Sequence, residues 1–569
     1  MSPAASGSAP PAWGRRHTVV LVAALGLCAF LYFFALGDIA FLGKDEPKNA
    51  QAARSMLERG DWVTTRLQGE PWFDKPILYY WTAVVGYRLF GVSELGARVG
   101  PALAALLTLC FTAGLARRML RPQPHAAALA VFVLGSSLEY FWLARSAVTD
   151  ALLACFVTAT LVAWWRARES DQALRWFVAA GAAAGMAALA KGPVGIALPA
   201  LIIGADLLLG RTLAPLRPGR IAAAVAAFLA VAGPWYTLVT LRSEGRFFRD
   251  FILHYNVERF TTENLPHPGP FYYYLPVLLL GPFPWSAFLP GAGIRIAREW
   301  RQLPPAERGA IRFLLLWIGV PLLFFSFAGS KLPSYLLPTL PAIALLLTRE
   351  IVSVVIEAHR GRARPLAIGA FCFALVAGGI AGGTLFYLME RDPILLAPAF
   401  PFSIVLAGTA VAALAGLGLK RPGLVLGSIG AAAFLAPLAA VSWALPAAEN
   451  YASARQIALR AVALAPPGAP LLAYRFYDNS FFFYTNERAE RWWERRWIEQ
   501  RVEGLGEALC FVQTADLPEM LASERVTAEP LAAVAGIHLL RLRAVTPDPS
   551  SVPPPAAGQF PATEEGGLR

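Results

Sequence analysis

Three lysines in this 569-residue chain precede a proline that opens an apolar stretch. They are Lys75 in FDKPIL, Lys191 in LAKGPVG and Lys331 in GSKLPSY. Proline favours the first turn of a helix, so the pattern predicts a lysine at each of three helix N-termini. Unpaired backbone N–H groups and the helix dipole favour an anion there. Three such positions on one side of a membrane could bind phosphate; alternatively, the lysines extend from helix ends toward water.

Acidic residues occur at similar positions. Asp45 and Glu46 follow the first apolar stretch, and Asp150 begins a later one in ARSAVTDALLA. An acid at the end of a membrane span is costly unless it faces a cavity, which makes it a functional candidate. The alternative for Asp45 and Asp150 is a carboxylate in the first turn of a helix. Capping by Asp45 would not account for the adjacent Glu46.

The segment HYNVERFTTENLPHPGPFYYYLP adds other groups that could take part in chemistry. Arg259 could bind an anion, and His254 or His267 could carry a proton or bind a metal, although a lone histidine near a span end is more often structural. We interpret the aromatic run 271–274 as a membrane-interface belt rather than a sugar-stacking surface. Carboxylates, cations and aromatics together suit a lipid-linked phosphate substrate, with the cations stabilising the phosphate leaving group.

The elements that must position these groups are membrane spans. Charged residues make up 15% of the chain, its mean hydropathy is +0.50, and soluble proteins carry about 25% charged residues. Stretches free of Asp, Glu, Lys and Arg begin near residues 18, 99, 122, 151, 176, 192, 221, 268, 313, 332, 365, 393 and 422. Most have the roughly 17–25 residues that a spanning helix needs. The sequence predicts a polytopic α-helical membrane protein with about 13 transmembrane helices, the first of them retained rather than cleaved as a signal peptide.

Basic residues predict the orientation. Alternate loops are rich in arginine and lysine, which marks them as cytoplasmic. They contain Arg15 and Arg16; Arg117, Arg118 and Arg121; Arg166, Arg168 and Arg175; Arg211, Arg217 and Arg220; Arg295 to Arg312; Arg349 to Arg364; and Lys420 and Arg421. This topology accounts for much of the net charge of +12 and argues against nucleic acid as a partner. The five cysteines form no CxxC pair and no disulfide framework.

We expect three regions. Residues 1–446 would form the membrane domain, with a first outer loop at about 38–98 that carries interfacial helices near 45–58 and 76–89. Residues 447–544 would form a small periplasmic α/β domain, with two strand-like runs around Asp478-Asn479 and a helix in ERAERWWERRWIEQRV. Residues 545–569 are rich in Pro, Gly and Ser, and this composition predicts a disordered tail.

Three segments carry a resemblance to a known family. KDEPKNAQAARSMLERGDWVTTRLQGEPWFDKPILYYW, VERFTTENLPHPGPFYYYLP and SKLPSYLLPTLPAIALLL resemble the lipid A aminoarabinose transferases, which are related to the protein O-mannosyltransferases. The similarity extends over roughly 14–347. It implies a GT-C membrane fold with a periplasmic C-terminal domain. It also implies transfer of a sugar, such as 4-amino-4-deoxy-arabinose, from undecaprenyl phosphate to an acceptor such as lipid A at the outer face of the bacterial inner membrane.

The resemblance also implies roles for single residues. Asp45 matches the catalytic acid of the first loop, and Asp150 matches a second functional acid. Lys75, Lys191 and Tyr335 match positions of the lipid-phosphate site. The resemblance further suggests Asp74 and His267 as ligands of a divalent metal such as zinc.

The leading hypothesis is an inverting glycosyltransferase that uses a polyprenyl-phosphate sugar. With a hydroxyl acceptor Asp45 could be a base, whereas with an ionised phosphate it would position the acceptor, a metal or the donor's amine. The alternative acceptor is a protein hydroxyl, as in the O-mannosyltransferases. The alternative classes are a transporter of lipid-linked intermediates, which would show paired inverted repeats, and an envelope assembly protein that would not need the first-loop acids.

Overall fold

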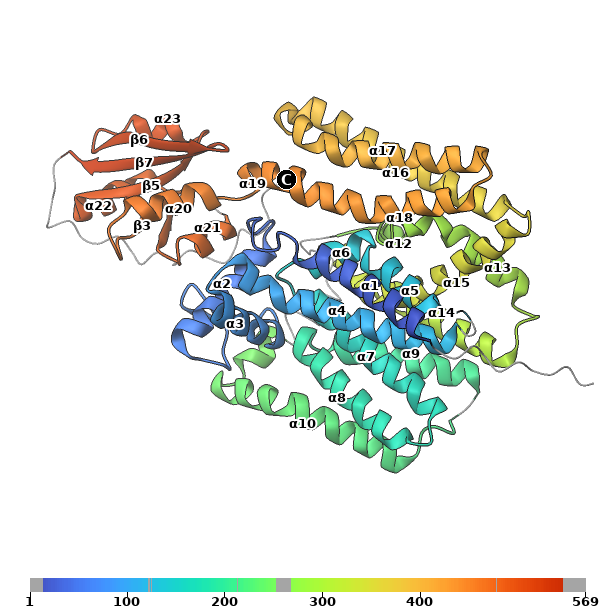
Figure 1. Ribbon diagram of the computed structural model, residues 1–569. Coiled ribbons are helices and arrows are strands. Elements are labelled where there is room, and N and C mark those ends of the chain that lie inside the picture. The colour runs from blue at the N-terminus through green and yellow to red at the C-terminus, as the bar shows by residue number, and fades with distance from the viewer. Residues whose placement is uncertain are drawn as a thin grey trace, which may run out of the picture. The chain divides into compact units, whose positions relative to one another are not determined.

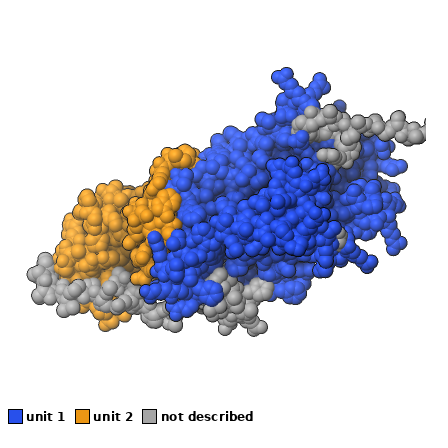
Figure 2. Space-filling model, turned by 90° about the horizontal axis from the view of Figure 1, so that it is seen from below, with its two compact units in different colours: residues 1–36, 73–86, 98–444 blue, residues 37–72, 87–97, 445–569 orange. Residues whose placement is uncertain are grey.

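The computed structural model describes residues 14–120, 123, 125–211, 213–251, 268–476 and 478–545. The chain divides into two compact units (Figure 2). The first contains residues 1–36, 73–86 and 98–444, and the second contains residues 37–72, 87–97 and 445–569. Most of the predicted first outer loop therefore belongs to the same unit as the C-terminal region. The tail predicted to be disordered lies outside the described residues, except for its first residue.

Ten helical segments of the described residues are long and apolar enough to span a membrane. They are α1 (Arg15–Phe33), α4 (Glu94–Met119), α7 (Asp150–Glu169), α8 (Ala173–Lys191), α10 (Pro218–Arg242), α14 (Pro305–Ser326), η4 (Pro333–Thr339) with α15 (Leu340–His359), α16 (Arg364–Arg391), η5 (Pro393–Leu395) with α17 (Leu396–Gly418), and α18 (Pro422–Ala439) with η6 (Ala440–Ala444) and α19 (Leu445–Ala452). Figure 1 shows α16, α17 and α18 running side by side. The prediction of a polytopic α-helical membrane protein is confirmed.

The remaining predicted stretches form shorter or bent elements. Helices α5 (Ala126–Gly135) and α6 (Leu138–Ala144) meet at 70°. A second pair, η2 (Phe271–Tyr273) with α12 (Tyr274–Leu280) and η3 (Trp285–Phe288) with α13 (Leu289–Glu299), is bent by 104°. Helix α9 (Val194–Gly210) has only 17 residues. The described residues thus hold ten spans, or up to twelve if each bent pair crosses once, beside the short helix α9.

The two bends contact each other through their backbones. The Leu138 N–H donates to the Phe283 carbonyl and the Glu139 N–H donates to the Gly281 carbonyl, both at 3.0 Å. Irregular backbone at membrane depth is tolerated where protein partners satisfy its polar groups. These bonds therefore hold the start of α6 against the second bent pair.

Small residues let α8 lie close to its neighbours. Helix α8 packs along α7 and α10 (Figure 1), and a Cβ atom on Gly181 would overlap the Ala224 carbonyl of α10. Small residues at such crossings allow close approach of helix backbones in membranes. This close packing holds α8, the helix that ends at Lys191, against α10.

The second unit begins with the residues of the first outer loop. Helix α2 (Asp45–Arg59) confirms the amphipathic helix predicted near 45–58, and α3 (Leu78–Phe90), which crosses from the first unit into the second, confirms the one predicted near 76–89. Between them lies a short hairpin of β1 (Arg66–Leu67) and β2 (Glu70–Pro71). Helix α2 packs on α21 (Asn479–Tyr484) of the C-terminal region.

The C-terminal region contains a five-stranded sheet in the order β4-β3-β5-β7-β6, which confirms a small α/β domain. Its strands are β3 (Leu471–Tyr474), β4 (Ala489–Trp492), β5 (Glu507–Gln513), β6 (Val526–Val534) and β7 (Ile537–Ala544), and its helices are α20 (Arg455–Leu464), α21 (Asn479–Tyr484), α22 (Arg495–Leu505) and α23 (Leu517–Leu521). Strand β3 is parallel to β4 and β5, whereas β7 is antiparallel to β5 and β6.

Two details of the predicted domain are wrong. The run after Asp478 is the helix α21 instead of a second strand, because the Asp478 carboxylate caps it by accepting the Ser480 N–H at 2.7 Å. Strand β3 finds its partners in parallel strands further along the chain, so no hairpin forms. The predicted helix in ERAERWWERRWIEQRV begins only at Arg495, and the residues Ala489–Trp492 before it form β4 on the edge of the sheet.

Candidate functional site

Asp150, Lys191 and Tyr335 come together from three elements of the first unit. Asp150 is the first residue of α7, Lys191 is the last residue of α8, and Tyr335 lies in η4. The Lys191 ammonium donates to Asp150 Oδ1 at 2.6 Å and lies 4.9 Å from the centre of the Tyr335 ring. The two charged side chains are largely buried, with 15% and 10% of their surfaces exposed. Lys191 has three N–H donors, so the Asp150 contact leaves others available for an anion.

The structure corrects the predicted position of Lys191. It ends α8 at the helix C-terminus and does not begin the next helix. The apolar stretch before it continues the helix through Ala190, and Gly192, with φ of +72°, ends it. A cation is stabilised by the dipole at a helix C-terminus, so Lys191 is held by that dipole and by Asp150. Its ammonium group is thus available to an anion directly, and the N-terminus of α9 begins three residues later, at Val194.

Aromatic residues pack around Tyr335. The rings of Tyr335 and Phe325 have centroids 4.9 Å apart, and Tyr273 and Tyr274 belong to the same cluster. Phe271 and Tyr272 are instead exposed, at 56% and 65%. The aromatic run thus has two faces. Its first two residues suit the predicted membrane-interface belt, and the next two form part of the wall behind Tyr335.

The other two predicted lysines each have a close partner. Lys75 pairs with the adjacent Asp74 at 2.9 Å, three residues before α3 begins. Lys331 is buried and donates to the Ala328 carbonyl at 2.6 Å, just before η4. Both lysines precede a helix, as the proline pattern predicts.

The suggested metal ligands are only partly described. Asp74 carries the ion pair with Lys75, while Arg259, His254 and His267 lie outside the described residues. Within those residues no group of three His, Cys, Asp or Glu side chains is arranged to hold a metal ion.

Sequence reasoning missed Glu139, which lies at the start of α6. Both of its carboxylate oxygens are buried, and neither has a hydrogen-bond partner among the described residues. A Cβ atom on Gly281 would overlap this carboxylate, and Asp150 is near enough for the two charges to interact. An acid inside an apolar stretch is itself a functional indication in a membrane protein, and the residues GSSLEYFW contain that indication.

The two first-loop acids differ in their surroundings. Asp45 begins α2 and is exposed, and within the described residues it has no hydrogen bond or ion pair. Glu46 is buried, and its carboxylate accepts the Leu42 N–H at 3.1 Å. This bond gives Glu46 a structural role in closing the turn before α2. Asp45 has a carboxylate that is available to a substrate.

A set of contacts that we call the Tyr484 clasp holds the segment before Asp45. It consists of Phe41, Glu94, Glu449, Arg455 and Tyr484. The Tyr484 hydroxyl accepts the Phe41 N–H at 3.0 Å and donates to Glu94 at 2.8 Å. Glu449 accepts the Ala40 N–H at 3.2 Å, and Arg455 donates to the Asp38 carbonyl at 3.0 Å. The C-terminal region therefore fixes the backbone that leads into α2.

The Tyr484 hydroxyl is suited to this role. Burial raises the pKa of Tyr484, and the neighbouring Glu94 carboxylate raises it further. The hydroxyl consequently stays protonated at neutral pH and remains a donor to Glu94. Its ring packs edge-on against Phe483, whose ring lies 4.8 Å from that of Phe41.

We expect Tyr484→Phe to loosen the segment that leads to Asp45. The change keeps the ring but leaves the Phe41 N–H without this acceptor, at a cost of about 1–3 kcal/mol for a buried polar group. Hydrogen exchange followed by mass spectrometry should show faster exchange in peptides covering residues 38–46. The matched control is Tyr474→Phe, which removes a 2.8 Å bond to Glu519 within the sheet region. Equal exchange at 38–46 in both variants would contradict a positioning role for Tyr484.

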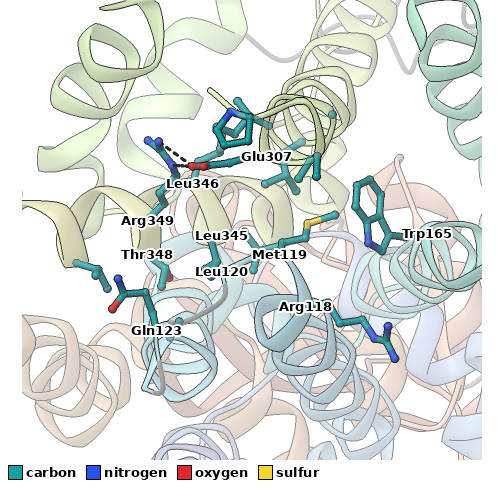
Figure 3. Close-up of a pocket in the computed structure, with 18 of the residues that line it drawn as sticks. Arg118, Met119, Leu120, Gln123, Trp165, Glu307, Leu345, Leu346, Thr348 and Arg349 are labelled. Atoms are coloured by element: carbon teal, nitrogen blue, oxygen red, sulfur yellow. Dashed lines mark hydrogen bonds and ion pairs between the residues drawn. The ribbon is translucent and has the colours of Figure 1, made fainter. Parts of the chain in front are cut away.

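The first unit also contains a cavity of about 600 Å³ near the C-terminal ends of α4 and α7 (Figure 3). Its lining includes Arg118, Trp165 and Arg349, and the figure shows the Arg349 guanidinium paired with Glu307. Trp165 lies 15 residues along α7 from Asp150, about 22 Å at the rise of an α-helix. This cavity is therefore separate from the group around Lys191.

Comparisons with known proteins identify a matching family model and several relatives. Residues 74–237 match the family model of dolichyl-phosphate-mannose-protein mannosyltransferases. The undecaprenyl phosphate-α-4-amino-4-deoxy-L-arabinose arabinosyl transferase of Pseudomonas paraeruginosa is 33% identical over 452 residues, which cover 78% of this chain and 77% of that protein. The correspondingly named proteins of Serratia proteamaculans and Edwardsiella ictaluri are 32% and 30% identical, and the chain spans 57% and 64% of their lengths.

The fold agrees with a solved structure. The crystal structure of ArnT from Cupriavidus metallidurans bound to undecaprenyl phosphate matches with a TM-score of 0.76 and 26% identity, covering 92% of this chain and 98% of that one. The chain is thus an integral membrane protein with the GT-C fold of glycosyltransferases. It belongs to the family of undecaprenyl phosphate-α-4-amino-4-deoxy-L-arabinose arabinosyl transferases. The family predicted from the three sequence segments is confirmed.

Proposed function

We propose that this protein is an inverting glycosyltransferase that moves 4-amino-4-deoxy-L-arabinose from undecaprenyl phosphate to lipid A. The observation that carries the proposal is the group of Asp150, Lys191 and Tyr335, a cation held at the end of two spans beside an aromatic wall. Such a group suits the phosphate of a membrane-bound donor, whose long apolar chain stays in the lipid. The relatives' names and the lipid bound in the Cupriavidus structure support the same donor.

In the proposed reaction, an oxygen of the acceptor forms a bond to the anomeric carbon of the sugar. The bond between that carbon and the phosphate oxygen breaks, and undecaprenyl phosphate leaves with the electron pair. Lys191 would stabilise the charge that develops on the leaving phosphate, together with Lys75, Lys331 and Arg259. If the acceptor is an ionised phosphate of lipid A, no proton needs to move, and Asp45 positions the donor's amine, because a carboxylate and an ionised phosphate repel each other. If it is a hydroxyl, Asp45 accepts its proton.

The proposal includes a location and a division of the chain. We place the basic loops in the cytoplasm of a bacterial cell and the ends that carry Lys191 and Asp150 at the periplasmic face of the inner membrane. Residues 1–446 form the membrane domain, and 447–544 form the periplasmic domain. The Tyr484 clasp suggests that this second domain serves to hold the first-loop acid.

Purified protein in nanodiscs tests this function. Undecaprenyl phosphate carrying aminoarabinose would be supplied with lipid A, and the products would be weighed by mass spectrometry. We expect lipid A to gain one aminopentose and undecaprenyl phosphate to accumulate. Lipid A treated with phosphatase is the matched acceptor, and it should remain unmodified. Transfer to added envelope protein would favour a protein O-glycosyltransferase, and lipid binding without any transfer would favour a transporter.

A further inference from the structure

A groove of about 550 Å³ lies among helices α4, α7, α8 and α10. We call it the α4/α8 groove, and its lining is nearly all apolar. Small residues leave its floor open: Gly114, Ala159, Ala163, Ala179, Ala182 and Ala183. In a spanning protein such a space suits an acyl chain. An acyl chain that fits the groove gains more dispersion contacts there than it has in bulk lipid.

Two arginines are the only charged residues among the described lining, and no acid lines the groove. Arg118 is near the C-terminal end of α4, and Arg166 is in the last turn of α7. The Arg166 guanidinium lies 4.5 Å from the centre of the Trp176 ring, and Arg175 lies 5.6 Å from the same ring. One end of the groove therefore has arginine side chains next to the Trp176 ring, while the rest of its lining is apolar.

The charge of Arg166 is not balanced by a direct partner. Within the described residues it has no ion pair or hydrogen bond, and Glu169 pairs with Arg118 at 2.8 Å. The nearby cavity of Figure 3 differs, because Arg168 pairs with Asp206 at 2.6 Å and Arg349 pairs with Glu307 at 3.1 Å. Those arginines have acidic partners within the protein. In the α4/α8 groove Arg118 is likewise paired, with Glu169, but its other N–H donors and the Arg166 guanidinium remain available to a ligand.

We propose that the α4/α8 groove is a binding site for an anionic glycerophospholipid, with its phosphate on Arg118 and Arg166 and one acyl chain along the small residues. Basic pockets between spanning helices on the cytoplasmic side are known to select such headgroups. A guanidinium matches a phosphate in geometry and keeps its charge inside the membrane boundary. In the orientation proposed above, the site lies in the cytoplasmic leaflet. It is at the opposite ends of α7 and α8 from Asp150 and Lys191, so it is distinct from the proposed donor site.

Native mass spectrometry of the purified full-length protein tests this site. The protein would be incubated with equimolar phosphatidylglycerol and phosphatidylcholine. We expect wild type to retain one phosphatidylglycerol in preference to phosphatidylcholine. The double variant Arg118→Gln/Arg166→Gln should retain roughly tenfold less, because both phosphate contacts are lost. Arg421→Gln, an exposed arginine in the loop before α18, is the matched control and should bind as wild type does.

A second variant tests the apolar part without changing charge. A Cβ atom on Gly114 would meet nothing within 4 Å, so Gly114→Leu should fill the groove without displacing protein atoms. We expect it to reduce phosphatidylglycerol retention as well, whereas Gly26→Leu, at an equally open position on α1, should not. Equal retention in all variants, equal binding of phosphatidylcholine, or displacement by added undecaprenyl phosphate would each overturn the proposal. Because the readout is lipid binding, the outcome of this test does not depend on whether the protein transfers a sugar.

Discussion

Asp45→Asn is expected to reduce sugar transfer by about a hundredfold or more while leaving the protein nearly as stable as wild type. A carboxylate that transfers a proton contributes roughly 10²–10⁴ in rate, and one that positions a reactant contributes roughly 10². Asp45 is exposed at the start of α2 and has no partner in the described part of the chain, so the structural cost of removing its charge is limited to the interaction with the helix dipole, about 0.3–1 kcal/mol. The measurement is the rate of aminoarabinose transfer to lipid A, with thermal unfolding recorded in parallel.

Two nearby acids provide controls for this prediction. Asp38→Asn removes another exposed carboxylate from the same segment and should leave transfer unchanged. Glu46→Gln keeps an oxygen that can accept the Leu42 N–H, so the turn before α2 should persist and most of the activity with it. Activity of Asp45→Asn within about twofold of wild type would remove Asp45 from the mechanism.

The pH dependence of transfer separates the two roles of Asp45. A base must lose its proton before the reaction, so the rate would rise with pH and then level off. The Asn variant would lose that rise. If Asp45 only positions the donor's amine, wild type and variant should share the same pH profile, with a lower rate in the variant. We expect the second result, because the proposed acceptor needs no deprotonation near neutral pH.

Much of the membrane fold could be predicted because hydrophobicity alone determines which stretches span a bilayer. Each of the thirteen predicted stretches coincides with a helix or a bent pair. The residues at which helices end were harder to predict, because they depend on local backbone geometry. Lys191 ends α8 since Gly192 adopts a positive φ, whereas Pro193 does precede a helix as predicted, because α9 begins at Val194.

The C-terminal region shows where tertiary partners decide the structure. The aromatic residues of α21 have high strand propensity, but they pack on α2, a segment more than 400 residues earlier in the chain. The Tyr484 clasp was unpredictable for the same reason, since no local pattern links Phe41, Glu94 and Tyr484. Glu139 was visible as an acid in an apolar stretch, although its burial became apparent only from the bends that surround it.

The pair of Asp150 and Lys191 should show opposite effects when each partner is removed. Lys191→Met is expected to weaken binding of undecaprenyl phosphate and to destabilise the protein. Removal of one member of a buried ion pair costs about 3–5 kcal/mol, because the other charge is left unpaired. Asp150→Asn leaves Lys191 with more N–H donors for the lipid phosphate, so we expect binding at least as tight as in wild type. Transfer should nevertheless fall, because the ammonium is no longer oriented.

The double variant Asp150→Asn/Lys191→Met distinguishes structure from function at this site. With no unpaired charge, it should recover most of the thermal stability lost in Lys191→Met, yet it should bind undecaprenyl phosphate no better than that single variant. Lys420→Met, at an exposed lysine between α17 and α18, controls for the loss of one positive charge. Equal losses of affinity in Asp150→Asn and Lys191→Met would mean that the pair only holds α7 and α8 together. The phosphate would then have to be bound by Lys75, Lys331 or Arg259, and Lys191 would be a structural residue.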